Sequence, residues 1–252
     1  MDNARRAFCI VVLALFCCSC GGRSPGGGKA VTPVASSDQC LLVLAEDWDS
    51  TQGTLSLFER SWTGSWKAVG PGVPVFLGRK GLGWGRGLHP EQTEGPRKAE
   101  GDGRAPAGIF TLDSAFGRAP LAPQLKTFPF LVVNGQTICV DDGVSSRYNT
   151  VFQADQVPVR NWDSCENMLR SDARYDLGLL VGHNPPPVVP GGGSCIFMHL
   201  FSEPPLPTSG CTSMARPDME RLLRRLDTVK RPVLVQLPRA EYGRLKTVWG
   251  LP

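Results

Sequence analysis

Residues 194–214 read Ser194-Cys-Ile-Phe-Met-His-Leu-Phe-Ser-Glu-Pro-Pro-Leu-Pro-Thr-Ser-Gly-Cys-Thr-Ser-Met214. An apolar stretch that carries His199 is followed by a proline-rich loop and then by Cys211 on a glycine turn. A strand end, a loop and a turn return the chain to where it left, so Cys211 comes within reach of His199. A thiol beside an imidazole is the minimal equipment of a cysteine nucleophile.

Each part of this stretch has an expected chemical role. Gly210 permits a turn that exposes the thiol of Cys211. A protonated His199 would lower the pKa of that thiol and populate the thiolate. Backbone N–H groups at Ser209, Gly210 and Cys211 would stabilise an oxyanion, and a backbone carbonyl would serve to orient the imidazole. The alternative is structural: a hydrogen-bonded core histidine and a small buried cysteine.

The composition favours one β-rich domain. Hydrophobic residues make up 41% of the 252 residues and charged residues 20%, which allows a real core. The 29 glycines and 22 prolines indicate many turns rather than a helix bundle. The net charge of +4 is too small to suggest nucleic-acid binding. It falls to +3 without residues 1–19, which carry two arginines and one aspartate.

The N-terminus is typical of an exported protein. Arg5 and Arg6 precede an apolar stretch, 7–16, that is too short to span a bilayer comfortably. A serine and then Cys20 follow, as at a bacterial lipoprotein cleavage site, although Cys17 stands where leucine is usual. We expect a lipoprotein-type signal peptide over 1–19 with Cys20 lipidated, an ordinary secretory signal or uncleaved anchor being the alternative. A flexible tether over 20–38 and a catalytic domain over 39–252 complete the expected organisation.

Cysteine counting leaves one thiol over. Nine cysteines suit an oxidising compartment, and five of them lie outside the leader: Cys40, Cys139, Cys165, Cys195 and Cys211. If four of these pair, one stays free, and the glycine turn favours Cys211 as the free thiol. The sequence does not assign the pairs.

Apolar alternation and turn residues predict mostly antiparallel strands. A glycine-rich loop without regular structure is expected over 78–103, and its polar end, 97–104, is either solvated or one rim of a substrate groove. An Asn134-Gly135 turn predicts a hairpin. The expected strands are 40–45, 54–58, 66–69, 73–77, 109–112, 128–133, 137–141, 177–182, 195–201 and 231–237, with helices over 161–174 and 217–227. The strand 54–58 should pair with 40–45 across a turn near Gln52-Gly53.

Two motifs resemble the L,D-transpeptidase catalytic domain, also called the YkuD family. Thr208-Ser-Gly-Cys211 fits its Ser/Thr-His-Gly-Cys signature, with His199 as the upstream histidine. Pro106-Ala-Gly-Ile-Phe110 resembles the Pro-x-Gly-x-Phe/Tyr that opens its core. The similarity covers roughly 40–237. Three features depart from the family's usual pattern. Ser209 replaces the second histidine, Ser213 stands where many members have arginine, and the loop after His199 is shorter than usual. These features are typical of a branch with the motif Thr-x-Gly-Cys-Thr-Ala/Ser-Met.

The resemblance implies a mainly β sandwich with a few short helices and a long-loop active-site region. It implies that Cys211 attacks an L-to-D peptide bond of a peptidoglycan stem, with His199 as base and then acid and no cofactor or metal. An amine, including that of a protein, or water would resolve the thioester. The expected location is the periplasmic side of the bacterial envelope. Expected substrate contacts are the 97–104 loop with Arg104, and Arg147, Tyr148 and Asn149.

Two other functions stay open. One is a zinc site built from His183, Cys195, His199 and Cys211, which the spacing disfavours because Cys195 and His199 lie about 13 Å apart on a strand. The other is a catalytically silent envelope protein that binds cell-wall polymer, which the departures at Ser209 and Ser213 favour.

Overall fold

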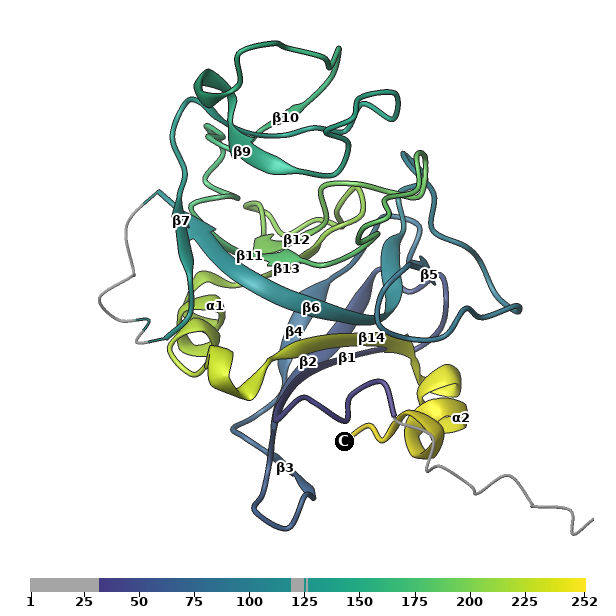
Figure 1. The fold of residues 1–252 in the computed structure, drawn as a ribbon. Coiled ribbons are helices and arrows are strands. Elements are labelled where there is room, and N and C mark those ends of the chain that lie inside the picture. Colours follow the sequence, from purple (N-terminus) through teal and green to yellow (C-terminus); the bar gives the residue numbers. More distant parts are fainter. Residues whose placement is uncertain (1–31, 119–124, 126) are drawn as a thin grey trace, which may run out of the picture. The chain divides into compact units, whose positions relative to one another are not determined.

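A computed structural model describes residues 32–118, 125 and 127–252 (Figure 1). Thr32–Pro252 form one compact unit. The expected signal peptide over 1–19, the lipidation site Cys20 and most of the expected tether lie outside the described residues. The end of that tether does not: Val34 is buried, and Arg60 donates to the carbonyls of Val34 and Ser37. The folded body therefore begins before residue 38. Within the described residues, no helix has the length and apolar character needed to cross a membrane.

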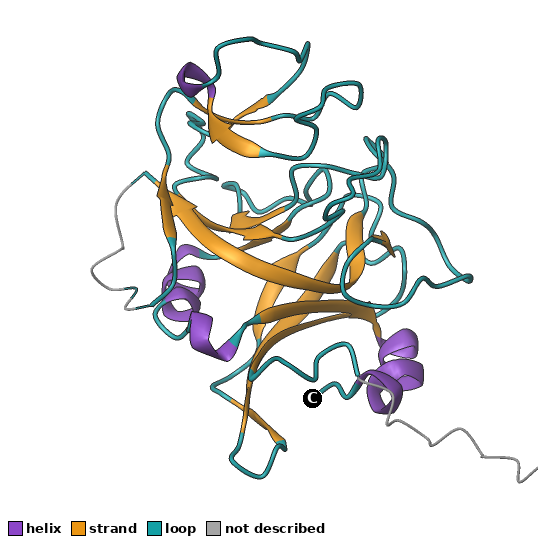
Figure 2. Cartoon of the chain, viewed as in Figure 1, coloured by secondary structure: helices purple, strands orange, loops and turns teal. Residues whose placement is uncertain are grey.

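Most of the regular structure is strand, which confirms the expectation of a mainly β protein (Figure 2). In the large sheet, pairing runs β1-β14-β6-β11-β12-β13-β4-β2, and β2 also pairs with β1, so this path closes into a ring. The strands of the ring are β1 (Gln39–Ala45), β2 (Gln52–Arg60), β4 (Val73–Phe76), β6 (Ala105–Gly117), β11 (Leu177–Val181), β12 (Phe197–Leu200), β13 (Thr212–Met214) and β14 (Val233–Pro238).

The ring encloses the main core because strand side chains that point inward are apolar. Leu41, Val43 and Val235 are fully buried members of this core, and so are Ile109 and Phe110 of β6, which point to opposite faces of their strand. The short strands β3 (Trp66–Ala68), β5 (Leu82–Trp84) and β7 (Phe130–Val132) pair at its edges. The presence of β5 corrects the expectation that 78–103 contains no regular element.

A separate three-stranded sheet is formed by β8 (Thr137–Cys139), β9 (Val151–Gln153) and β10 (Glu166–Asn167). The expected hairpin of 128–133 with 137–141 is therefore wrong. The turn forms, since Thr137 N–H donates to the Asn134 carbonyl, but β7 pairs in parallel with β6 and β8 pairs with β9 and β10. The Asn134-Gly135 signal predicts only the turn. Which strands pair depends on where their apolar faces become buried.

Within the described part of the chain, two α-helices pack against strands of the large sheet: α1 (Arg216–Leu223) against β11 and β12, and α2 (Arg239–Trp249) against β14 and β1. Pro217 stands in the first turn of α1, and Met219, Leu222 and Leu223 are its buried face, as the pattern of 217–227 predicts. Short 3₁₀ turns are η2 (Ala154–Gln156) and η3 (Thr228–Lys230).

The expected helix over 161–174 is wrong. Short polar side chains of this segment accept from nearby backbone and favour turns: Asn167 accepts from Leu169 N–H, and Asp172 accepts from Arg174 N–H. Such bonds compete with helical hydrogen bonds.

The glycine of the Pro106–Phe110 motif has a steric explanation. Gly108 adopts φ +138°, and a Cβ built there would lie 2.0 Å from Cε1 of His89. His89 is itself buried, and its Nδ1 accepts from Ile109 N–H at 3.0 Å. Only glycine allows β6 to approach this ring and take this backbone conformation. The glycine of this motif therefore determines how closely β6 packs against His89.

Candidate active site

Strands β12 and β13 run in parallel and bring the histidine and the cysteine together. His199 is level with Ser213 and Met198 with Thr212, so Cys211, one residue before β13, is level with Phe197. Phe197 N–H donates to Cys211 Sγ at 3.3 Å, which agrees with this register. Paired residues of a ladder share a face, so the thiol lies on the face of His199, with their Cα atoms about 8 Å apart diagonally. Both side chains line one cavity.

The imidazole of His199 is neutral, and its Nε2 atom is the one able to accept a proton. Its Nδ1 lies 2.6 Å from the Leu200 carbonyl oxygen, and only a protonated nitrogen can make that bond, so Nε2 carries the lone pair. Burial lowers the pKa of His199 to about 4, because a low-dielectric site disfavours the imidazolium. The Leu200 carbonyl occupies the orienting position for which a backbone carbonyl was expected.

The thiol of Cys211 is also neutral at rest. Its Sγ donates to the Cys195 carbonyl at 3.6 Å. Burial raises the pKa of Cys211 to about 12, and the negative charge of Glu166 adds to the increase. The expectation that a protonated His199 lowers the thiol pKa is therefore wrong for the resting site. Burial outweighs charge pairing here, so both the thiol and the imidazole are neutral at rest.

The cavity has a volume of about 810 Å³ and carries both signs of charge. Lys98, Glu100 and Gly101 come from the expected rim at 97–104, which the structure therefore places at the site. Ser209 and Gly210 lie beside Cys211 in its wall. The other lining residues are Asp141, Cys165, Glu166, Asn167, Leu169, Arg170, Ser171, Arg174, Tyr175, Ser194, Cys195, Ile196, His199 and Thr208.

Backbone donors beside the thiol are partly engaged. Gly210 N–H donates to Thr208 Oγ1 at 3.1 Å, and Thr208 Oγ1 itself donates to the Cys211 carbonyl at 2.6 Å. Within the described residues, the N–H groups of Ser209 and Cys211 have no such partner. These two are the donors available to an oxyanion.

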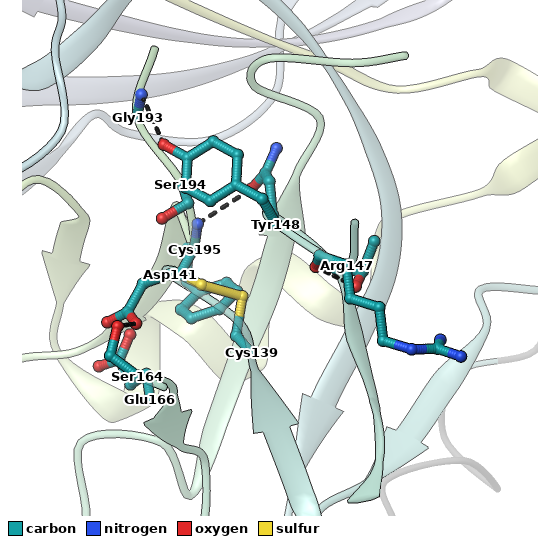
Figure 3. Close-up of a disulfide and its surroundings, with 12 residues drawn as sticks. Cys139, Asp141, Arg147, Tyr148, Ser164, Glu166, Gly193, Ser194 and Cys195 are labelled. Atoms are coloured by element: carbon teal, nitrogen blue, oxygen red, sulfur yellow. Dashed lines mark hydrogen bonds between the residues drawn. A yellow bond between two sulfur atoms is a disulfide. The ribbon is translucent and has the colours of Figure 1, made fainter. Parts of the chain in front are cut away.

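A disulfide joins Cys139 of β8 to Cys195, and it fixes the wall behind the thiol (Figure 3). Cys195 has φ +53°, and its carbonyl is the acceptor for Cys211. The disulfide thus ties the three-stranded sheet to the backbone carbonyl that accepts from the Cys211 thiol. Cys40, Cys165 and Cys211 are free, so of the two pairs that the count allowed, one forms among the described residues.

Tyr148 and Asn149 support the same wall and do not line the cavity. Tyr148 Oη accepts from Gly193 N–H (Figure 3) and donates to Glu100. Asn149 Oδ1 accepts from Cys195 N–H at 3.0 Å. Both side chains therefore hold the segment that carries the disulfide.

Arg104 and Arg147 also lie outside the cavity lining. Arg104 donates to the carbonyls of Trp48 and Leu82 and pairs with Asp49 at 2.8 Å. The guanidinium of Arg147 lies over the Phe152 ring, 5.1 Å from its centroid. Both cations make intramolecular contacts in this structure.

The residues of the zinc alternative do not come together. Cys195 is in the disulfide, and His183 Nε2 lies 3.0 Å from the Gly192 carbonyl oxygen. Within the described residues, no group of three His, Cys, Asp or Glu side chains is arranged to hold a metal ion.

Sequence reasoning missed the polar side of the cavity, which comes from 165–175. Glu166, Arg170 and Tyr175 line it, yet they fall in or just after the segment that was expected to be a helix. Neither a motif nor a spacing marks them, because the pairing of β10 with β8 is what turns this segment toward Cys211.

Comparison with protein-family models finds no match, and a search of curated proteins finds none either.

Proposed function

We propose that the chain is a peptidoglycan-modifying cysteine acyltransferase of the L,D-transpeptidase kind, with the fold of that family. The observation that carries the proposal is the juxtaposition of Cys211 and His199 on one face of β12 and β13, at the wall of a cavity. The Nδ1 bond to Leu200 leaves Nε2 as the base on this histidine. A cavity of about 810 Å³ is large enough for several residues of a stem peptide.

Acylation follows from the neutral resting pair. Cys211 Sγ attacks the carbonyl carbon of an L-to-D peptide bond while His199 Nε2 takes the thiol proton. The N–H groups of Ser209 and Cys211 receive the oxyanion. The imidazolium then gives its proton to the leaving amine of a D-amino acid, and a thioester remains on Cys211. Lys98, Arg170 and Arg174 line the cavity and would receive the carboxylates of the stem. In the structure Lys98 pairs with Asp102, and both arginines pair with Asp172.

Deacylation runs by the same groups in reverse. His199 Nε2 takes a proton from an amine or a water as it attacks the thioester, and returns that proton to the departing sulfur. The products are a cross-link or an attached protein with an amine, and a shortened stem with water. As part of the proposal, the protein works on the periplasmic side of the envelope with Cys20 as its lipid attachment site.

Product analysis tests this function. Purified protein is incubated with tetrapeptide and pentapeptide stems, and the products are identified by mass spectrometry. We expect cross-linked or trimmed stems from wild type and none from Cys211→Ala. Cys165→Ala is the matched control, because Cys165 is a free, exposed cysteine that lines the same cavity. Equal turnover in Cys211→Ala and wild type would refute the proposal.

One observation favours the silent alternative, in which the cavity binds cell-wall polymer without reacting. The thiol is buried, with a pKa raised to about 12, and the histidine is neutral. On that account, stems bind equally well to wild type and Cys211→Ala, and no product forms with either protein.

A further inference from the structure

Tyr175 packs against one member of the proposed catalytic pair and shares a buried cluster with the other. Its ring packs against the His199 ring with centroids 5.2 Å apart and an interplanar angle of 65°. It belongs with Cys211 to one buried cluster, and both line the cavity. A buried tyrosine needs a hydrogen-bond partner, and Tyr175 Oη donates to Glu166 Oε1 at 2.6 Å.

Glu166 is held where its charge acts on the thiol. The β10–β8 ladder places it opposite Cys139, and Arg170 Nη1 lies 3.7 Å from its Oε1. Figure 3 shows the Glu166 carboxylate beside Asp141, at the side of the disulfide. Burial raises the pKa of Glu166, so this carboxylate is costly to keep charged, and the Tyr175 hydroxyl offsets part of that cost.

The two side chains affect Cys211 in opposite directions. The negative charge of Glu166 raises the pKa of the thiol, whereas the neighbouring hydroxyl of Tyr175 acts to lower it. The hydroxyl has one proton to donate and two competing acceptors, the carboxylate and the sulfur. At rest the sulfur is a neutral thiol and a weak acceptor, so the proton points to Glu166.

We propose that Tyr175 is a positioning residue whose hydroxyl transfers its hydrogen bond from Glu166 to Cys211 Sγ as the sulfur becomes anionic, and that Glu166 restrains this exchange. The thiol proton goes to His199 Nε2, and Tyr175 keeps its own proton throughout. The inference rests on the proposed role of Cys211 as the nucleophile. Other charged or titratable groups that act on this region are Lys98, Asp141, Arg170, Asp172, Arg174 and His199.

Alkylation by iodoacetamide tests the exchange without any peptide substrate. The rate at each cysteine is measured by peptide mass spectrometry at neutral and alkaline pH. Cys165 is exposed and serves as the internal standard for the reagent, whereas Cys40 is fully buried and is labelled only when the body unfolds. Each variant therefore reports its own folding in the same measurement.

Opposite effects are expected from two conservative variants. Tyr175→Phe removes only the hydroxyl and slows labelling of Cys211 roughly tenfold, since a hydrogen bond to a charged group is lost. Glu166→Gln keeps an acceptor for Tyr175 but removes the charge, so labelling of Cys211 becomes several-fold faster. Tyr148→Phe is the matched control, because its hydroxyl donates to Glu100 behind the wall, and we expect it to match wild type.

Shifts in the same direction for Tyr175→Phe and Glu166→Gln, or no shift in either, would overturn the proposal. If Cys40 becomes labelled in Tyr175→Phe, that variant has unfolded and the test rests on Glu166→Gln alone. Slower or unchanged labelling of Cys211 in Glu166→Gln would then refute the exchange. Alkylation needs no stem peptide, so the expected order of rates without stem-peptide turnover would sink the proposed function and leave this inference standing.

Discussion

Acidification should destabilise the body because its three histidines are all buried and neutral. His89, His183 and His199 are 9%, 2% and 4% exposed, and burial lowers the pKa of each from 6.5 to about 4. His89 Nδ1 also accepts from Ile109 N–H, a bond that a proton on Nδ1 would break.

The sign follows from proton uptake. Between pH 6.5 and about 4 the unfolded chain binds protons at these histidines and the folded chain does not, so stability is lost as pH falls through this window. At about pH 5 each histidine lowers the free energy of unfolding by about 2 kcal/mol, or roughly 6 kcal/mol in all. That is about the whole stability of a typical domain. Glu166 acts in the opposite direction: its pKa is raised, so the folded chain binds a fraction of a proton more at this group than the unfolded chain does. This offsets a small part of the lost stability.

Urea unfolding followed by tryptophan fluorescence measures this effect, at about pH 7.5 and about pH 5. The disulfide stays intact, since no reductant is added. We expect the midpoint to fall steeply with acid while the denaturant slope stays constant. An unchanged midpoint between the two pH values would refute the assignment of three buried neutral histidines.

Three further predictions concern the backbone, the disulfide and the base. Gly108→Ala should destabilise the body by more than about 3 kcal/mol in urea unfolding, through the clash with His89 and the positive φ, whereas Gly135→Ala, with open space around its Cβ position, should have little effect. Replacing Cys139 and Cys195 together by serine opens a loop of 56 residues and should cost about 2–4 kcal/mol, seen as a lower melting temperature; an unchanged value would argue against the pairing. The rate of stem-peptide turnover should fall on acidification only near pH 4, where His199 becomes protonated, rather than near pH 6.5. A stopped-flow pH jump measures the rate before the slower unfolding takes place.

Local sequence patterns predicted those parts of the fold whose cause is local. The alternation of Thr54–Phe58 against Cys40–Ala45 gave the β1–β2 pair, and Pro217 with its apolar spacing gave α1. The last helix was missed although it carries signals: Pro238 precedes it, and Gly250 ends it with φ +67°. Leu245 and Trp249, four residues apart, are its buried face.

The residues of the candidate site also fall into two groups, those that a local pattern predicts and those that only long-range pairing brings in. His199 and Cys211 are close in sequence, so a loop between them was enough to predict that they share a site. Glu166 and Tyr175 reach Cys211 only because β10 pairs with β8 and the disulfide ties β8 to Cys195. Pairing between distant segments leaves no mark in the local pattern, and the same holds for the burial that reverses the expected charge state of the thiol.

The proposed function depends on one step, the acylation of Cys211 by a stem peptide. Rapid acid quench of purified protein with a tetrapeptide stem, followed by peptide mapping in a mass spectrometer, measures this directly. The account predicts an adduct with the mass of the stem lacking its terminal D-amino acid, on the peptide that contains Cys211, and its accumulation when amine acceptors are withheld. An adduct on Cys165 instead, or stem trimming that persists in Cys211→Ala, would contradict it.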